Sequence, residues 1–208
     1  MKSGESKPLR GRPVNEHARE ERITQILNGA RNCFIQRGFH ASSISEISAA
    51  AGVSIANIYQ YFPSKEALII ALIEFDLQRH HTLINHFWST DFSRKAIEEL
   101  LADIFLTAEG HALAALRAEI VSEGARNIHV AALLRDSESD LISSVQSMIS
   151  AAQRSGRISG ELNPEAVTDR LSLVFEGLMR LYLFSPANGQ ELIEKYYLQF
   201  ADTLQLKY

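Results

Sequence analysis

The chain has 208 residues, of which 46 % are hydrophobic and 22 % charged, so it has enough apolar side chains for a packed core and is not a disordered chain. Its one cysteine, Cys33, excludes an internal disulfide and leads us to expect a cytoplasmic protein. No stretch approaches the roughly 20 apolar residues of a membrane span, and the polar N-terminus lacks the apolar segment of a signal peptide.

The net charge of −4 hides an uneven distribution. Residues 1–65 contain nine Lys or Arg against five Asp or Glu, whereas residues 66–208 contain twelve against twenty. A basic region attracts phosphate and an acidic one repels it. The first 65 residues are therefore the part of the chain suited to a polyanionic partner such as DNA.

Residues 1–15 are rich in Lys, Gly, Ser, Arg and Pro and are predicted to form a disordered basic arm. Within this arm, Arg10 and Arg12 belong to the sequence Arg-Gly-Arg-Pro, which is narrow and cationic enough to follow a DNA minor groove. The alternative is a basic tail that is merely solvated.

A first helix is expected from a cap at Asn15 to a stop at Gly38, where glycine supplies the left-handed conformation common at helix ends. One apolar stripe at helical spacing supports it, namely Ile23, Ile26, Leu27, Ala30 and Phe34. Cys33 lies next to this stripe and is interpreted as a packed small side chain.

The next segment predicts a second helix with a capping box. Ser43 stands three residues before Glu46, so the serine can accept from the Glu46 backbone N–H and the carboxylate can reach back to the Ser43 backbone. Gly52 ends this helix after about two turns.

A third helix begins three residues later with Ser54 as its cap. Ile58 and Phe62 form its inward face, and Pro63 ends it. Two short helices joined by a three-residue turn predict a helix-turn-helix, in which the second helix enters the major groove of DNA. We therefore predict a DNA-binding head over residues 16–63.

The faces of the third helix suggest which residues contact DNA. Ile55 and Ala56 suit apolar contact with thymine methyl groups, and Gln60 is long enough to pair with an adenine edge. Hydroxyl groups and a lysine nearby can donate to phosphate. The predicted DNA-binding residues are Arg10, Arg12, Ser43, Ser45, Ser54, Ile55, Ala56, Asn57, Tyr59, Gln60, Tyr61 and Lys65. The competing interpretations are that Ile55 packs on a neighbouring helix, that Gln60 is solvated and that Tyr61 stacks on the first helix.

The remaining residues, 64–208, predict a larger helical bundle. Further helices are expected at about Ser64–Trp88, Ser93–Glu109, His111–Gly124 and Ile128–Arg154, then from Pro164 to a turn at residues 185–189, and finally to the C-terminus. The fold class is thus all-α, with about nine helices and no repeat of fixed period.

No motif for catalysis, a cofactor or a metal ion is present. The sequence lacks a nucleophile elbow and a phosphate loop, so an enzyme is only a remote alternative. His81 and His86 are five residues apart rather than the four of a helical metal site.

Residues 52–68 read Gly-Val-Ser-x-x-x-x-Tyr-x-Tyr-Phe-Pro-Ser-Lys-Glu-x-Leu, and Ser-Ser-Ile-Ser-Glu-Ile precedes them at 42–47. Over about residues 17–70 this resembles the DNA-binding head of the TetR (tetracycline repressor) family. The resemblance implies a homodimer, usually a repressor, that binds an inverted-repeat operator and releases it when a small-molecule effector enters the body. Two departures are Ile55-Ala56, where many members have Lys-Gly, and Ser45, where many have a basic residue.

The resemblance also implies a dimer interface on the last two helices, about Pro164–Ser185 and Gly189–Lys207. The apolar residues assigned to it are Val167, Leu171, Val174, Leu178, Ile193, Tyr197, Phe200 and Leu204. Candidate effector-pocket residues are Phe75, Phe87, Trp88, Phe105, Glu119, Phe175, Glu176 and Met179. For the aromatic residues the alternative is ordinary core packing, and for the two glutamates it is an exposed face. The effector stays unidentified, with a slight preference for a neutral, apolar or cationic compound, and an activator or ligand-independent regulator remains an alternative function.

Overall fold

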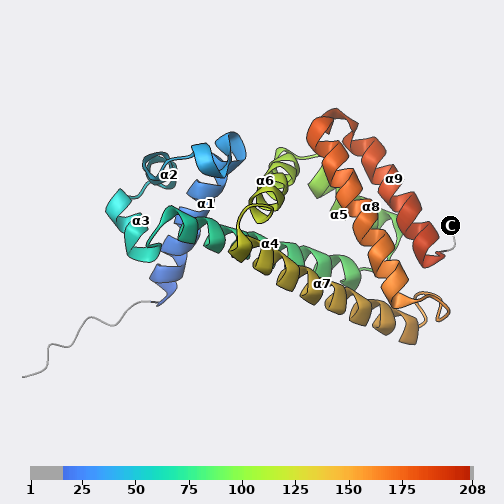
Figure 1. The fold of residues 1–208 in the computed structure, drawn as a ribbon. Helices are drawn as coiled ribbons and strands as arrows, with labels where there is room; N and C mark the ends of the chain where they lie inside the picture. The colour runs from blue at the N-terminus through green and yellow to red at the C-terminus, as the bar shows by residue number, and fades with distance from the viewer. Residues whose placement is uncertain (1–15, 207–208) are drawn as a thin grey trace, which may run out of the picture.

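The computed structural model describes residues 16–206, and within this range all regular structure is helical. The helices are α1 (Glu16–Ala41), α2 (Ile44–Ala51), α3 (Ile55–Tyr61), α4 (Lys65–Ser89), α5 (Arg94–Phe105), α6 (Ala108–Gly124), α7 (Ile128–Arg154), α8 (Pro164–Phe184), the 3-10 turn η1 (Pro186–Asn188) and α9 (Gly189–Leu204). Figure 1 shows α1–α3 gathered at one end and α5, α8 and α9 at the other, with the long helices α4 and α7 running between the two ends. No helix in this range has the length and apolar character needed to cross a membrane.

The predicted helix ends in the head are confirmed at the level of single hydrogen bonds. Ser43 accepts from the Glu46 backbone N–H at 3.2 Å, and the Glu46 carboxylate accepts from the Ser43 backbone N–H at 2.8 Å, which completes the capping box. Gly52 adopts the left-handed conformation (φ 65°, ψ 33°), and the Ser54 side chain caps α3. These local signals place the turn between α2 and α3 where the sequence predicts it.

Two helix boundaries differ from the prediction. Gly38 has the expected positive φ of 79°, but one more helical turn follows it to Ala41. The break between α5 and α6 comes earlier than predicted, because Thr107 accepts from the Gly110 backbone N–H and caps α6. Gly110 is therefore not a helix breaker. A side chain there would place its Cβ 1.7 Å from the Ile104 carbonyl oxygen, so the glycine permits a close approach of the chain to itself.

Between residues 16 and 206, the buried apolar side chains form two clusters. The first joins the head to the body: Ile26, Phe34 and Ile58 pack with Leu72 of α4 and Leu116 of α6. The second lies wholly in the body and is rich in aromatic rings in edge contact. Helix α4 contributes to both clusters, since its first half packs with the head and its last turn with the body. Packing is thus continuous across the predicted boundary at residues 63 and 64.

Candidate nucleic-acid interface

The position of α3 is fixed by α1 and α2. Helix α2 lies very close to α1, because a Cβ at Gly29 would be only 2.6 Å from the Cβ of Ala51. The Gln25 side chain of α1 donates to the Ala51 carbonyl at 2.7 Å and ties down the end of α2. Ile58 of α3 is fully buried in the head cluster. The opposite face of α3 is therefore held outward on a rigid support.

That outward face contains the predicted base-reading residues together with Tyr59, which is predicted to donate to phosphate. Ile55 is 43 % exposed and Tyr59 48 % exposed, and Ala56 and Gln60 are exposed as well. Ile55 is therefore not buried against a neighbouring helix in the single chain. Exposed side chains of this size on a short, well-supported helix leave apolar surface available to a partner.

Two other residues of α3 are already engaged within the head. Asn57 is half-buried, and its side-chain amide donates to Gln60 at 3.2 Å, so Gln60 has a protein partner in this structure. Tyr61 is half-buried and packs against the head cluster, which agrees with its alternative as a structural residue. Fewer residues of α3 are therefore available for contact with bases than were predicted.

Several of the predicted phosphate-binding groups already have partners within the protein. Ser43 and Ser54 both use their hydroxyl oxygens as helix caps, and Ser45 is exposed on α2. The amine of Lys65 donates to the His40 carbonyl at 3.0 Å and so links the start of α4 to the end of α1. The predicted arm, which includes Arg10 and Arg12, lies outside the described residues.

Sequence reasoning overlooked Arg37 and Arg31. Arg37 forms an ion pair with Glu46, the acid of the capping box, on the surface of the head. Hydrogen bonds from Ser43 and the nearby Arg37 hold the pKa of Glu46 below its usual range. Arg31 is almost fully buried and points from α1 toward the body, where it pairs with Glu109 at 2.9 Å. Its place one turn from Leu27 and Phe34, inside an apolar stripe, was the only sequence signal for this role.

The candidate pocket residues fall into two groups. Phe87, Trp88, Phe105 and Met179 are buried in the body cluster, while Phe175 and Phe75 are half-buried against the body and head clusters respectively. The two glutamates lie apart from each other. Glu176 forms an ion pair with Arg117 near the surface, and Glu119 accepts from the Phe39 backbone N–H at 3.2 Å, in the contact between head and body.

Arg117 of α6, which forms the ion pair with Glu176, also contacts a buried histidine between α4, α6 and α8. Arg117 approaches His80 Nδ1 at 3.4 Å, and the His80 ring stacks on Phe175 with 6.3 Å between centroids. Burial, with Arg117 as a second cause, lowers the pKa of His80 to about 3, so its ring is neutral. Arg117 Nε and His80 Nε2 are buried and have no hydrogen-bond partner among the described residues.

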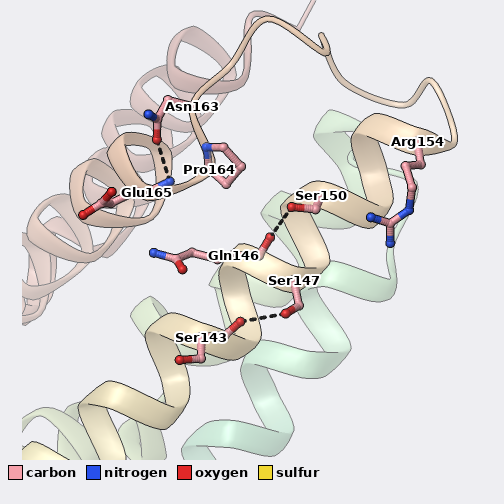
Figure 2. A pocket seen from close by; sticks show the side chains of 8 residues that line it. All are labelled: Ser143, Gln146, Ser147, Ser150, Arg154, Asn163, Pro164 and Glu165. Carbon is pink, nitrogen blue, oxygen red and sulfur yellow. Dashed lines mark hydrogen bonds between the residues drawn. The ribbon is translucent and has the colours of Figure 1, made fainter.

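A separate groove on the surface between α7 and the start of α8 has a volume of about 700 Å³. Figure 2 shows the side chains that line it. Its lining is polar, but Ser147 donates to the Ser143 carbonyl and Ser150 to the Gln146 carbonyl, both at 2.9 Å. None of the predicted pocket residues lines this groove. Its hydroxyl groups are engaged by their own helix, as the dashed lines of Figure 2 show.

The predicted dimer residues are packed inside the single chain. Seven of the eight are buried in the single chain, and Val174 is half-buried against the same body cluster. The periodicity found an apolar stripe, but this stripe packs α8 and α9 onto the rest of the body. The exposed apolar side chains lie on the other face, with Leu173 75 % and Phe184 73 % exposed on α8, together with Leu181 and, on α9, Leu198.

Comparison with known proteins agrees with this architecture. The family model described as "Bacterial regulatory proteins, tetR family" matches residues 26–72, the region of the helix-turn-helix. The HTH-type transcriptional regulator UidR of Escherichia coli is 36 % identical over 154 residues, which cover 72 % of this chain and 75 % of the relative. The chain belongs to the TetR family. It is therefore a helix-turn-helix transcriptional regulator.

The likeness to solved structures extends over most of the chain. Salmonella enterica GusR superposes with a TM-score of 0.70 at 26 % identity, covering 95 % of this chain and 100 % of that one. FadR from Bacillus subtilis, solved in complex with stearoyl-CoA, gives a TM-score of 0.63 at 17 % identity, covering 84 % of this chain and 97 % of that one. The second likeness concerns the fold alone.

Proposed function

We propose that this TetR-family regulator is a homodimeric repressor that acts in the cytoplasm, binds an inverted-repeat operator and is released from it by a small-molecule effector. The observation that carries the DNA-binding part is the outward face of α3, where Ile55 and Tyr59 stand exposed on a helix anchored by buried Ile58. In such an arrangement the second helix of the motif enters the major groove. Membership of the TetR family, whose members are usually repressors, favours repression over activation.

At the operator, Ile55 and Ala56 contact thymine methyl groups and Gln60 pairs with a base after leaving Asn57. Tyr59 and the hydroxyls of Ser45 and Ser54 donate to phosphate, and the Ser43 hydroxyl does so after leaving Glu46, to which it donates at 2.9 Å. Lys65 adds positive charge, and the arm with Arg10 and Arg12 follows the minor groove. Asn57 and Tyr61 act mainly by holding α3 in shape, since both are half-buried in the head.

The dimer forms through the outer face of α8 and α9 rather than through the residues predicted from periodicity. Leu173 and Phe184 are its main apolar contacts, joined by Leu181 and Leu198. Gly177 lies on α8 between Leu173 and Phe184, and a Cβ there would meet nothing within 4 Å in the single chain. A glycine at that place lets the α8 helix of a second copy approach closely. Two-fold symmetry of the dimer is then matched by symmetry of the operator.

The effector binds between α4, α6 and α8. Arg117 Nε and His80 Nε2 are N–H donors, and each costs about 1–3 kcal/mol when buried without an acceptor. His80 carries its proton on Nε2 because Nδ1 faces the arginine. An effector with acceptor oxygens and a flat apolar part beside Phe175 fits these groups, and the fold holds a small molecule in the FadR complex. This preference replaces the neutral, apolar or cationic compound suggested by overall charge.

A selection from random double-stranded DNA with the purified protein tests the proposal. We expect an inverted repeat to be enriched, and its affinity to fall steeply as salt is raised, because phosphate contacts release counterions. Equal, salt-independent binding to the best palindrome and to random DNA would contradict the proposal. Reporter expression from the cognate promoter, with and without the gene for this protein, gives the sign of regulation.

A further inference from the structure

Three glutamates of α6 hold the head. Glu109 accepts from Arg31 Nη1 at 2.9 Å, Glu119 from the Phe39 backbone N–H at 3.2 Å, and Glu123 faces His40 Nε2 at 3.0 Å. Helical geometry places these glutamates within about a quarter of the helix circumference and over about 21 Å of its length. We call Glu109, Glu119 and Glu123 the α6 glutamate row. It contacts α1 from the middle of that helix to its last turn.

The row fits α1 in one register. Between its glutamates, Leu116 and Ile120 are buried in the same cluster as Phe34 and Phe39 of the head. At the Glu119 contact, Gly38 has a φ of +79°, and a Cβ there would lie 3.1 Å from both carboxylate oxygens. A shift of α6 along α1 would break the polar contacts and the apolar packing together, because helix surfaces interlock at fixed intervals.

Burial of Arg31 makes its contact with Glu109 sensitive to position. The Arg31 side chain is only 7 % exposed, whereas the Glu109 side chain is 61 % exposed and is also approached by Arg79 of α4 at 3.7 Å. Asp76 of α4 is buried nearby. Burial raises the pKa of this carboxyl group, while the positive charges of Arg31 and other arginines partly offset the effect. Charge-assisted contacts of this kind are short and directional, so they hold α1, α4 and α6 in one arrangement.

The arrangement of α1 decides where α3 lies. Helix α2 is fixed to α1 by the close approach at Gly29 and Ala51, and α3 follows α2 through Ile58. The body, in turn, holds the two copies together. The distance between the two recognition helices is therefore set where α6 meets α1.

We propose that the α6 glutamate row determines the half-site spacing that the dimer accepts, which is a specificity role beyond base contact. This inference rests on the proposed function, because it needs a dimer on an inverted repeat. Half-sites of such operators lie about one helical turn, 34–36 Å, apart. A change of one base pair both shifts and rotates one half-site, so a head held in one register tolerates it poorly.

The test measures two affinities of the full-length protein. The first is for the selected inverted repeat with its central spacer unchanged, shortened or lengthened by one or two base pairs. The second is for a duplex with a single half-site. The variants are Glu109→Gln with Glu119→Leu, which removes the charge paired with Arg31 and the acceptor for Phe39, and Glu109→Gln with Glu119→Gln, which keeps an acceptor for Phe39. Glu98→Gln is the matched control. Glu98 pairs with Arg94 at 2.7 Å, and both residues belong to α5 of the body, away from the head.

We expect wild type and Glu98→Gln to prefer one spacing about tenfold over its neighbours, and the Gln/Leu variant to lose most of that preference. Its half-site affinity should stay within about twofold of wild type, and the Gln/Gln variant should recover part of the preference. An unchanged spacing profile in the Gln/Leu variant would overturn the inference, as would a parallel loss of half-site affinity, since that points to a damaged head. If wild type itself shows no preference for an inverted repeat, the proposed function fails, and the inference fails with it.

Discussion

The α2–α3 corner and the α8–α9 pair are both helix pairs with an apolar stripe, yet the stripe means different things in them. In the corner, α3 and its C-cap have a single buried face, formed by Ile58 and Phe62, and the exposed face with Ile55 and Tyr59 is left for a partner. Helix α8 has two apolar faces, one buried around Leu178 and one exposed around Leu173. For a short helix with one buried stripe, the sequence indicates which face points outward. For a longer helix with two apolar stripes, it does not indicate which stripe is buried.

The largest expected effect comes from comparing substitutions on the buried face and on the exposed face of the α8–α9 pair. Phe200→Asp should unfold the protein, because Phe200 is fully buried and even its truncation to alanine would cost about 3–5 kcal/mol. Leu173→Glu with Phe184→Glu should leave a folded chain that no longer dimerises. Urea denaturation and analytical ultracentrifugation measure the two outcomes. A folded Phe200→Asp monomer would mean that the buried stripe, not the exposed one, is the interface.

In the α2–α3 corner, two neighbouring substitutions should affect DNA binding differently. Tyr59→Phe removes a phosphate donor and should weaken binding by a similar factor on all sequences. Gln60→Ala should reduce discrimination at one base pair of each half-site, by about 1–3 kcal/mol. Fluorescence anisotropy with the operator, its single-base variants and random DNA measures both. If the two variants lose specific and random binding in the same proportion, the assignment of roles is wrong.

Gly38 belongs neither to the α2–α3 corner nor to the α8–α9 pair. It lies where the head meets α6. Gly38→Ala should destabilise the fold by about 1–3 kcal/mol, because its φ of +79° and ψ of 168° belong to a conformation that side chains rarely adopt. Gly160→Ala is the control, since a Cβ there would meet nothing within 4 Å and its φ is not positive. Chemical denaturation gives the difference, and equal stability of the two variants would argue against strain at Gly38.

The smallest effect concerns pH and the cap of α2. The pKa of Glu46 is lowered in the folded head, so its ionised form stabilises the fold. That contribution is present above the unfolded pKa of a glutamate and is lost as pH falls through the lower folded value. Glu46→Gln should therefore reduce stability at neutral pH and flatten its dependence on pH in the acid range. Thermal melts from neutral to acid pH would show parallel curves for wild type and variant if the cap does not depend on charge.

Much of the head could be predicted because its determinants lie close together in the chain. The capping box of Ser43 and Glu46, the left-handed Gly52 and the stop at Pro63 each act over three or four residues. The same holds for the inward face of α3. The predicted break before α6 was wrong for an equally local reason. Thr107 caps the helix, and Gly110 permits close packing instead of ending a helix.

The sequence by itself determined the all-helical class, the helix-turn-helix and the outward face of Ile55 and Tyr59, because hydrogen bonds and periodicity within one short segment decide them. Only the tertiary structure decided that Arg31 meets Glu109 across 78 positions of the chain, or which stripe of α8 the body covers. Such choices depend on which helix lies opposite. Periodicity reports that a face is apolar or charged, but the partner of that face is chosen by the packing of the whole chain.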